Sequence, residues 1–177
     1  TRVPVDAGAQ CSVLLVPPFA EELNKCRRML ATLATRLASR GWQVVLPDLG
    51  GTGDSHGDFG EARVGDWVDD LADAAAAAAV AAPVTAILGV RLGACLATAL
   101  LPRLPAITRI VLWQPVLSGQ QHLTQFLRLR VAAGALTGRG GNPTVAGLRA
   151  ELQGGTPVEV AGYEISPALA TDLDALR

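Results

Sequence analysis

The residues with the clearest chemical signature are the five in Gly89-Val90-Arg91-Leu92-Gly93. They follow an apolar segment rich in β-branched residues and precede a helical pattern, so they are predicted to form the turn between a strand and a helix. Glycines on both sides suit a strained turn in which the strand and the helix approach too closely for side chains. The central residue is Arg91, whose guanidinium stays protonated and cannot attack a carbonyl group.

Two roles are open to Arg91. With the amide of Leu92 at the start of a helix, its planar donors could bind a carboxylate or a phosphate, helped by the helix dipole. Alternatively, Arg91 is a structural cation that is neutralised by Glu21, Glu22 or Asp48, because an unpaired buried charge is costly.

A second segment, Val13 to Ala20, reads as a strand followed by a turn. Pro17 and Pro18 have no N–H group, so the first amides able to face a ligand are those of Phe19 and Ala20. Amides in such a turn can stabilise a negatively charged oxygen.

A third segment, Pro47 to Ser55, is a Gly-rich loop that adds Asp48 and Ser55 as polar candidates for the same site. Ser55 is followed by His56, but adjacent side chains rarely point toward each other, and Ser55 is predicted to cap a turn. The glycines do not form a dinucleotide-binding pattern, because His56 stands where the third glycine would be.

Four apolar segments must position these turns, and their alternation with helical segments predicts one parallel sheet covered on both faces. The predicted strands are Cys11–Val16, Trp42–Leu46, Val84–Leu88 and Arg109–Trp113. The predicted helices between them cover about 23–37, 66–82 and 92–101. Arg91 would then lie at the carboxyl end of the third strand, where open parallel sheets bind ligands.

The pattern changes after residue 113. Helices are predicted over 119–133 and 144–153, a Gly-rich loop over 134–143, one short strand over 158–163 and a last helix from about 167. We expect residues 1–113 to be the N-terminal part of an α/β core and residues 114–177 to be a mainly helical lid or cap. The three turns described above resemble those of α/β-hydrolases, and this resemblance implies that the C-terminal part of the core is absent from this chain.

In chain order, the Phe19 turn, the Asp48 loop and the Arg91 turn resemble the oxyanion-hole turn, the D-x-x-G-x-G-x-S loop and the G-x-S-x-G nucleophile elbow of α/β-hydrolases. The chain also resembles a narrower group, the exosortase A system-associated hydrolases of the second type, which are found beside bacterial exopolysaccharide and protein-sorting genes. The segments that carry this resemblance are Pro18–Lys25 with Arg27–Met29, Gly53–Ser55 with Gly57–Phe59, Gly89–Gly93 and Val160–Glu164. The resemblance implies an α/β-hydrolase fold, an open parallel sheet with helices on both faces, but it supplies no substrate.

Arg91 stands where the resemblance places a nucleophilic serine, so the ordinary Ser-His-acid mechanism cannot begin there. The sequence therefore leaves two classes open: a hydrolase with unorthodox chemistry, and a non-catalytic accessory protein that binds a small anionic or acyl ligand. A displaced nucleophile could be Cys26 or Cys95, although their apolar surroundings favour core positions.

Composition excludes several other classes. The chain has 177 residues, a net charge of −1 and 18% charged residues, which indicates a globular domain without a basic nucleic-acid surface. Lys25 is the only lysine, so the Gly-Lys pair of a phosphate-binding P-loop is missing.

The three cysteines suggest a reducing compartment, and we expect a cytoplasmic protein with no membrane span. His56 and His122 are the only histidines and have no partners at metal-ligand spacing, so we expect no metal and no cofactor.

Overall fold

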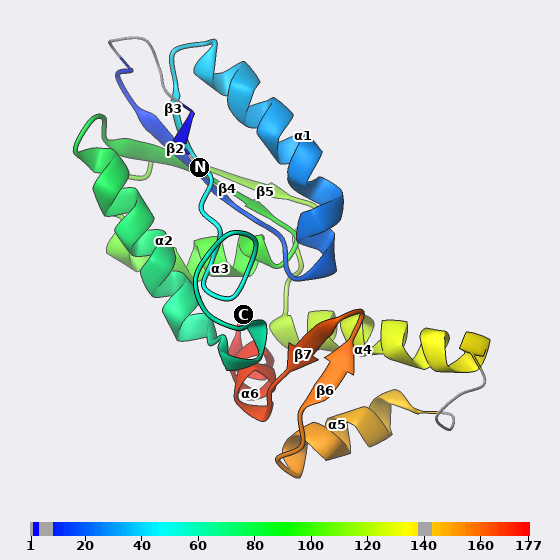
Figure 1. Cartoon of the computed structure of the whole chain (residues 1–177). Coiled ribbons are helices and arrows are strands. Elements are labelled where there is room, and N and C mark those ends of the chain that lie inside the picture. The colour runs from blue at the N-terminus through cyan, green and yellow to red at the C-terminus, as the bar shows by residue number, and fades with distance from the viewer. Residues whose placement is uncertain (1, 4–8, 138–142) are drawn as a thin grey trace.

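A five-stranded sheet of order β1-β3-β2-β4-β5 lies at the centre of the computed structural model, which describes residues 2–3, 9–137 and 143–177 (Figure 1). The strands are β1 (Arg2–Val3), β2 (Ser12–Val16), β3 (Gln43–Val45), β4 (Val84–Val90) and β5 (Arg109–Trp113). Strands β2 to β5 run parallel to one another, which confirms the predicted parallel sheet. The short β1, which was not predicted, pairs antiparallel with β3.

Helices pack on both faces of this sheet over β2, β3 and β4, which contribute apolar residues to both faces. The three helices of this part are α1 (Glu21–Ala38), α2 (Val64–Ala79) and α3 (Gly93–Leu100). Val13 and Leu15 belong to the hydrophobic cluster under α1, whereas Leu14 and Val16 belong to the cluster that contains α2 and α3. This alternation is the two-residue period of a strand.

The predicted helix boundaries differ from the observed ones by a few residues. Helix α2 begins at Val64 instead of 66 and ends at Ala79 instead of 82, and α3 begins at Gly93 instead of 92. Two short 3-10 helices, η1 (Phe59–Glu61) and η2 (Leu101–Arg103), were not predicted.

The expectation that all four strands are covered on both faces is wrong for β5. All five of its residues are exposed, and Val111 reaches 52%. The physical reason is its place at the edge of the sheet, with β4 as its only paired neighbour in the described part of the chain.

The chain after β5 is mainly helical. Its elements are α4 (Gly119–Thr137), α5 (Val145–Gln153), β6 (Val158–Val160), β7 (Tyr163–Ile165) and α6 (Pro167–Ala175). Helix α4 runs four residues beyond the predicted end at 133, and residues 138–142 of the predicted loop lie outside the described part. The single strand predicted over 158–163 is wrong, since Ala161 and Gly162 both have positive φ and turn the chain into a β6–β7 hairpin.

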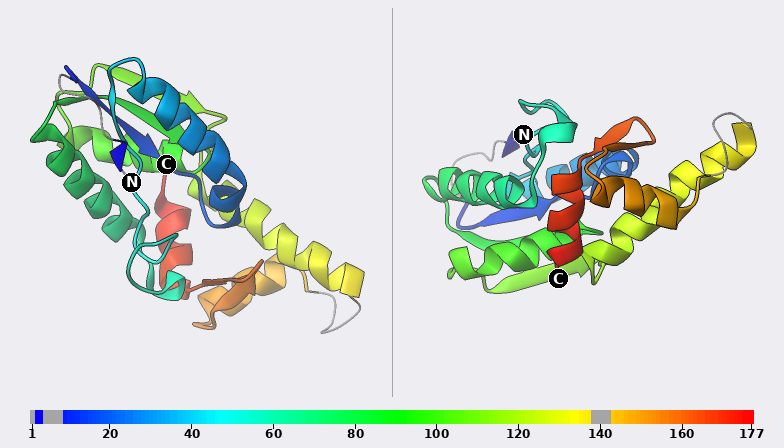
Figure 2. Two further views of the ribbon diagram at one scale, coloured as in Figure 1. Left: turned by 45° about the horizontal axis from the view of Figure 1, so that its top comes forward. Right: turned by 90° about the horizontal axis from the view of Figure 1, so that it is seen from below.

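This segment packs beyond the carboxyl ends of the parallel strands (Figures 1 and 2). Helix α6 contacts α2 and α4, and β7 contacts η1. Leu123 and Phe126 of α4 belong to the same hydrophobic cluster as Leu14 of the sheet. The assignment of residues 114–177 as a lid stays a prediction. Within the described residues, none of the helices combines the length and the apolar character that crossing a membrane requires.

Candidate functional site

The turn between β4 and α3 has the strained geometry that its sequence predicts. Arg91 has a φ of 55°, which non-glycine residues rarely adopt. A Cβ atom on Gly89 would lie 2.6 Å from the Cα of Ala94, and one on Gly93 would collide with the carbonyl oxygen of Pro17. Only glycine fits at these two positions, so the strand, the helix and the Phe19 turn approach one another closely.

Backbone strain is concentrated at this edge of the sheet. Four non-glycine residues in the described part have positive φ, and three of them follow the carboxyl ends of parallel strands. Ala20 (φ 47°) follows β2, Arg91 follows β4 and Gln114 (φ 45°) follows β5. Strained residues that gather at one place point to a functional site there.

Arg91 is held by an ion pair and by a neighbouring carbonyl group. Its Nε donates to Oε1 of Glu22 at 3.2 Å, and its Nη1 donates to the carbonyl oxygen of Gln114 in a long contact of 3.4 Å. About 30% of the Arg91 side chain remains exposed, so this pair is neither fully buried nor fully solvated. The guanidinium is thus fixed while part of it still faces outward.

The other two carboxylates considered for Arg91 have different partners. Glu21 pairs with Lys25 at 3.1 Å. Asp48 pairs with Arg27 at 3.7 Å, and its Oδ2 accepts a hydrogen bond from the amide of Asp54 at 3.3 Å.

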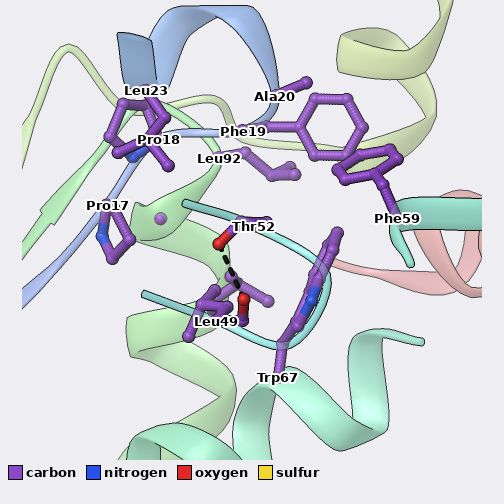
Figure 3. A pocket seen from close by; sticks show the side chains of 12 residues that line it. Pro17, Pro18, Phe19, Ala20, Leu23, Leu49, Thr52, Phe59, Trp67 and Leu92 are labelled. Atoms are coloured by element: carbon purple, nitrogen blue, oxygen red, sulfur yellow. Dashed lines mark hydrogen bonds between the residues drawn. The ribbon is translucent and has the colours of Figure 1, made fainter. Parts of the chain in front are cut away.

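The amides of Ala20 and Leu92 have no hydrogen-bond partner among the described residues. Both residues are nearly inaccessible, at 2% and 1% exposure, and neither N–H donates a hydrogen bond to another described residue. Both residues line the same small cavity of about 10 Å³, which is room for one water molecule. Figure 3 shows this cavity with the rings of Phe19, Phe59 and Trp67 gathered around it.

Ser55 lies away from this cavity. Its amide donates to the carbonyl oxygen of Thr52 at 3.0 Å, within the Gly-rich loop. Thr52 lines the cavity, and its own hydroxyl donates to the carbonyl oxygen of Leu49 at 2.7 Å (Figure 3). Ser55 is therefore not placed among the residues that surround Arg91.

The two cysteines considered as displaced nucleophiles are poorly activated. Burial raises the pKa of the Cys26 thiol, and the nearby carboxylate of Glu22 raises it further. Burial also raises the pKa of Cys95, whose thiol donates to the carbonyl oxygen of Val116 at 2.9 Å. Because the thiolate is the nucleophile, both residues are weak candidates at neutral pH. Cys26 nevertheless lines an open groove of about 370 Å³ together with Arg91.

The place of His122 in this site was not predicted from the sequence, which showed only that His122 has no partner at metal-ligand spacing. His122 lies in the first turn of α4 with 3% exposure, and its ring meets the ring of Phe19 edge to face at 5.4 Å. Burial and the positive charge of Arg91 lower its pKa from 6.5 to about 4. The sequence did contain one signal for this position. His122 precedes Phe126 by four residues, so the two side chains lie on the same face of the predicted helix. No three His, Cys, Asp or Glu side chains among the described residues form a group that could hold a metal ion.

A family model described as serine aminopeptidase, S33, matches residues 10–146. The chain belongs to this family of α/β-hydrolases. No curated protein sequence matched it.

Similar solved structures support the fold. The α/β-hydrolase GrgF from Penicillium sp. sh18 has a TM-score of 0.57 and 18% identity, over 96% of this chain and 65% of that one. A structure from a study of two metagenome-derived lipolytic enzymes, LipS and LipT, has a TM-score of 0.56 and 17% identity, over 97% and 66% of the two chains. Mouse α/β-hydrolase domain-containing protein 10 has a TM-score of 0.54 and 15% identity, over 99% and 64%. The chain thus spans just under two thirds of the length of these proteins.

Proposed function

We propose that this chain binds a small carboxylate or acyl ligand at the Arg91 turn and does not carry out serine-type acyl transfer. The ligand oxygen would accept hydrogen bonds from the amides of Ala20 and Leu92, beside the guanidinium of Arg91. The resemblance to the exosortase-associated group supports a role in such a bacterial system, and the free cysteines favour the cytoplasm.

The observation that carries this proposal is the pair of buried amides that have no partner in the described part of the chain. Buried backbone N–H groups are almost always hydrogen-bonded, because an unpaired one costs free energy comparable to a lost hydrogen bond. Both residues line one cavity and belong to two different turns, which supports a site for a negatively charged oxygen. A ligand oxygen would satisfy both.

The lack of acyl transfer follows from the side chain at the turn. A permanently protonated guanidinium has no lone pair with which to attack a carbonyl carbon. The thiol of Cys26, which lines a groove together with Arg91, has a raised pKa. The same groups can therefore bind an acyl oxygen without forming an acyl-enzyme.

The experiment combines thermal shift with covalent labelling. We expect butyrate to raise the melting temperature of the protein, since saturation at 100 times Kd stabilises the native state by about 2.7 kcal/mol. Arg91→Lys keeps the charge but loses the planar donors, so it should stay folded and bind butyrate more weakly. A fluorophosphonate probe should label no serine.

Two outcomes would contradict the proposal. One is stoichiometric fluorophosphonate labelling of any serine. The other is the absence of any butyrate effect on the wild type, which would leave Arg91 only as the partner of Glu22. Arg36→Lys, on the exposed side of α1, is the matched control and should bind butyrate as the wild type does.

A further inference from the structure

A polar groove lies among α4, α5 and α6, the three helices that follow β5 (Figure 1). Each of these helices contacts the other two. The groove has a volume of about 410 Å³, which is within the range of small-molecule sites. Most such sites are lined mainly by apolar side chains, but none of the described residues that line this groove is apolar. The groove therefore suits a hydrophilic ligand.

Glutamine side chains are concentrated in this groove. Four of the chain's seven glutamines line it, namely Gln120, Gln121, Gln125 and Gln153. All four are exposed, and their side-chain amides make no hydrogen bond to another described residue. A side-chain amide both donates and accepts hydrogen bonds, and so does a hydroxyl group. The groove thus presents several groups that match a polyhydroxylated ligand.

Arg149 of α5 fixes the shape of the groove. Its Nη1 donates to both carboxylate oxygens of Asp174 in α6, at 3.1 and 3.0 Å. Its Nη2 donates to the carbonyl oxygen of Gln120 and to the hydroxyl oxygen of Thr124 in α4, at 2.9 Å each. One guanidinium therefore joins the three helices that surround the groove. Since Asp174 neutralises Arg149, this pair contributes no net charge.

Arg128 supplies the net charge of the groove. It is the one lining charge that has no ion-pair partner in the described part of the chain. It follows Gln125 by three residues, so both side chains lie on the same face of α4. A guanidinium binds a carboxylate through two parallel hydrogen bonds. A phosphate monoester would bring more than one negative charge close to Asp174, so a single carboxylate matches this groove better.

We propose that this groove binds an acidic saccharide, whose hydroxyl groups bond to the glutamine amides and whose uronic acid carboxylate pairs with Arg128. A uronic acid combines the two features that the lining residues require, several hydroxyl groups and one carboxylate on the same ring. The inference goes beyond the proposed function and does not depend on it, because this groove shares no lining residue with the cavity of Ala20 and Leu92 or with the groove that contains Arg91.

The test compares the methyl glycosides of galacturonic acid and of galactose, which differ only in the carboxylate. Each is titrated into the isotope-labelled protein, and the amide chemical shifts are followed by NMR. The shifts should change in α4 and α5 around the groove. The wild type should bind the galacturonide about tenfold more tightly than the galactoside, the size expected of one charge-assisted hydrogen bond.

Three variants assign the two parts of the ligand to their residues. Arg128→Gln should reduce the preference for the galacturonide to about one, with the affinity for the galactoside unchanged. Gln125→Leu should weaken the binding of both glycosides by about fivefold, as expected when one neutral hydrogen bond is lost. Arg130→Gln is the matched control, because Arg130 is an exposed arginine of the same helix that does not line the groove. This control should bind both glycosides as the wild type does.

Four outcomes would overturn the inference. The first is that neither glycoside binds, and the second is that the wild type binds both equally. The third is an equal loss of preference in Arg128→Gln and Arg130→Gln, which would show attraction by the overall positive charge of the helix. The last is binding of acetate as tight as that of the galacturonide, since the hydroxyl groups would then contribute nothing.

Discussion

His122 places a titratable ring inside the packing between the sheet and α4. Its neighbours are aromatic on the side of Phe19 and Phe126, and the positive charge of Arg91 acts on it. Both burial and that charge disfavour the imidazolium, so the ring is neutral in the folded protein at pH 7.

This residue predicts a measurable pH dependence of stability. The pKa of His122 is about 4 in the folded state and 6.5 when unfolded, so the unfolded state takes up the proton first as the pH falls. The free energy of unfolding should therefore decrease from about pH 7 to pH 4 and then level off. The total loss from this residue is about 3 kcal/mol, from 1.36 kcal/mol for each unit of pKa.

Denaturant titrations of the wild type and of His122→Phe at several pH values measure this effect. The difference in the free energy of unfolding between the two proteins reports the contribution of His122 alone. The carboxylates, which titrate at the low end of the pH range, are present in both proteins and cancel. Parallel pH curves for the two proteins would show that His122 is not buried in its neutral form.

Among the elements, α6 supplies the N-terminal cap of α2. No side chain of α2 or of the residue before it caps this helix, but Asp172 of α6 accepts a hydrogen bond from the amide of Val64 at 3.2 Å. Asp172 also accepts from Nε and Nη2 of Arg63 at 2.7 and 2.9 Å. The hydrogen bond from Arg63 holds the pKa of Asp172 below its ordinary value. One carboxylate thus joins the last described helix to the start of α2.

Asp172→Ala should therefore lower the stability of the whole chain by about 1–2 kcal/mol at pH 7, by removing a helix cap and an ion pair that is partly exposed. The loss should fade as the pH drops through the lowered pKa of Asp172, because the protonated carboxyl no longer pairs with Arg63. Asp69→Ala, which removes an exposed pair with Arg103, is the control and should cost roughly 0.5 kcal/mol or less. Equal losses in both variants, measured by urea denaturation, would contradict the capping role.

At the scale of the whole molecule, β5 leaves an apolar edge of the sheet uncovered by any described element. Ile110, Val111, Leu112 and Trp113 are all more than 40% exposed, and the strand pairs only with β4. Exposed apolar edges are templates for pairing with another chain.

We expect this edge to cause concentration-dependent self-association of the chain. Val111→Lys should reduce it, because a charge on an edge strand opposes edge-to-edge pairing. Val80→Lys replaces a single exposed valine at the end of α2, at 90% exposure, and should have no effect. Light scattering over a concentration series measures both variants, and equal behaviour of the two would rule out β5 as the associating surface.

The sequence by itself determined the features that depend on neighbours along the chain. The spacing of Gly89 and Gly93 around Arg91 predicted the strained turn, because a close approach of strand and helix excludes a Cβ atom at both positions. Apolar segments separated by helical periodicity predicted the parallel sheet. Pro17 and Pro18 identified the amide of Ala20 as one of the first amides free to face a ligand.

Only the tertiary structure decided which residues meet across the chain. It selected Glu22 among three carboxylates for Arg91, because the direction in which each side chain leaves its helix or loop depends on packing. It brought His122 to Phe19 across more than a hundred residues, which no periodicity encodes. It also left β5 exposed although its sequence is apolar, because burial of a strand depends on whether another element packs against it, and this is a property of the assembled sheet.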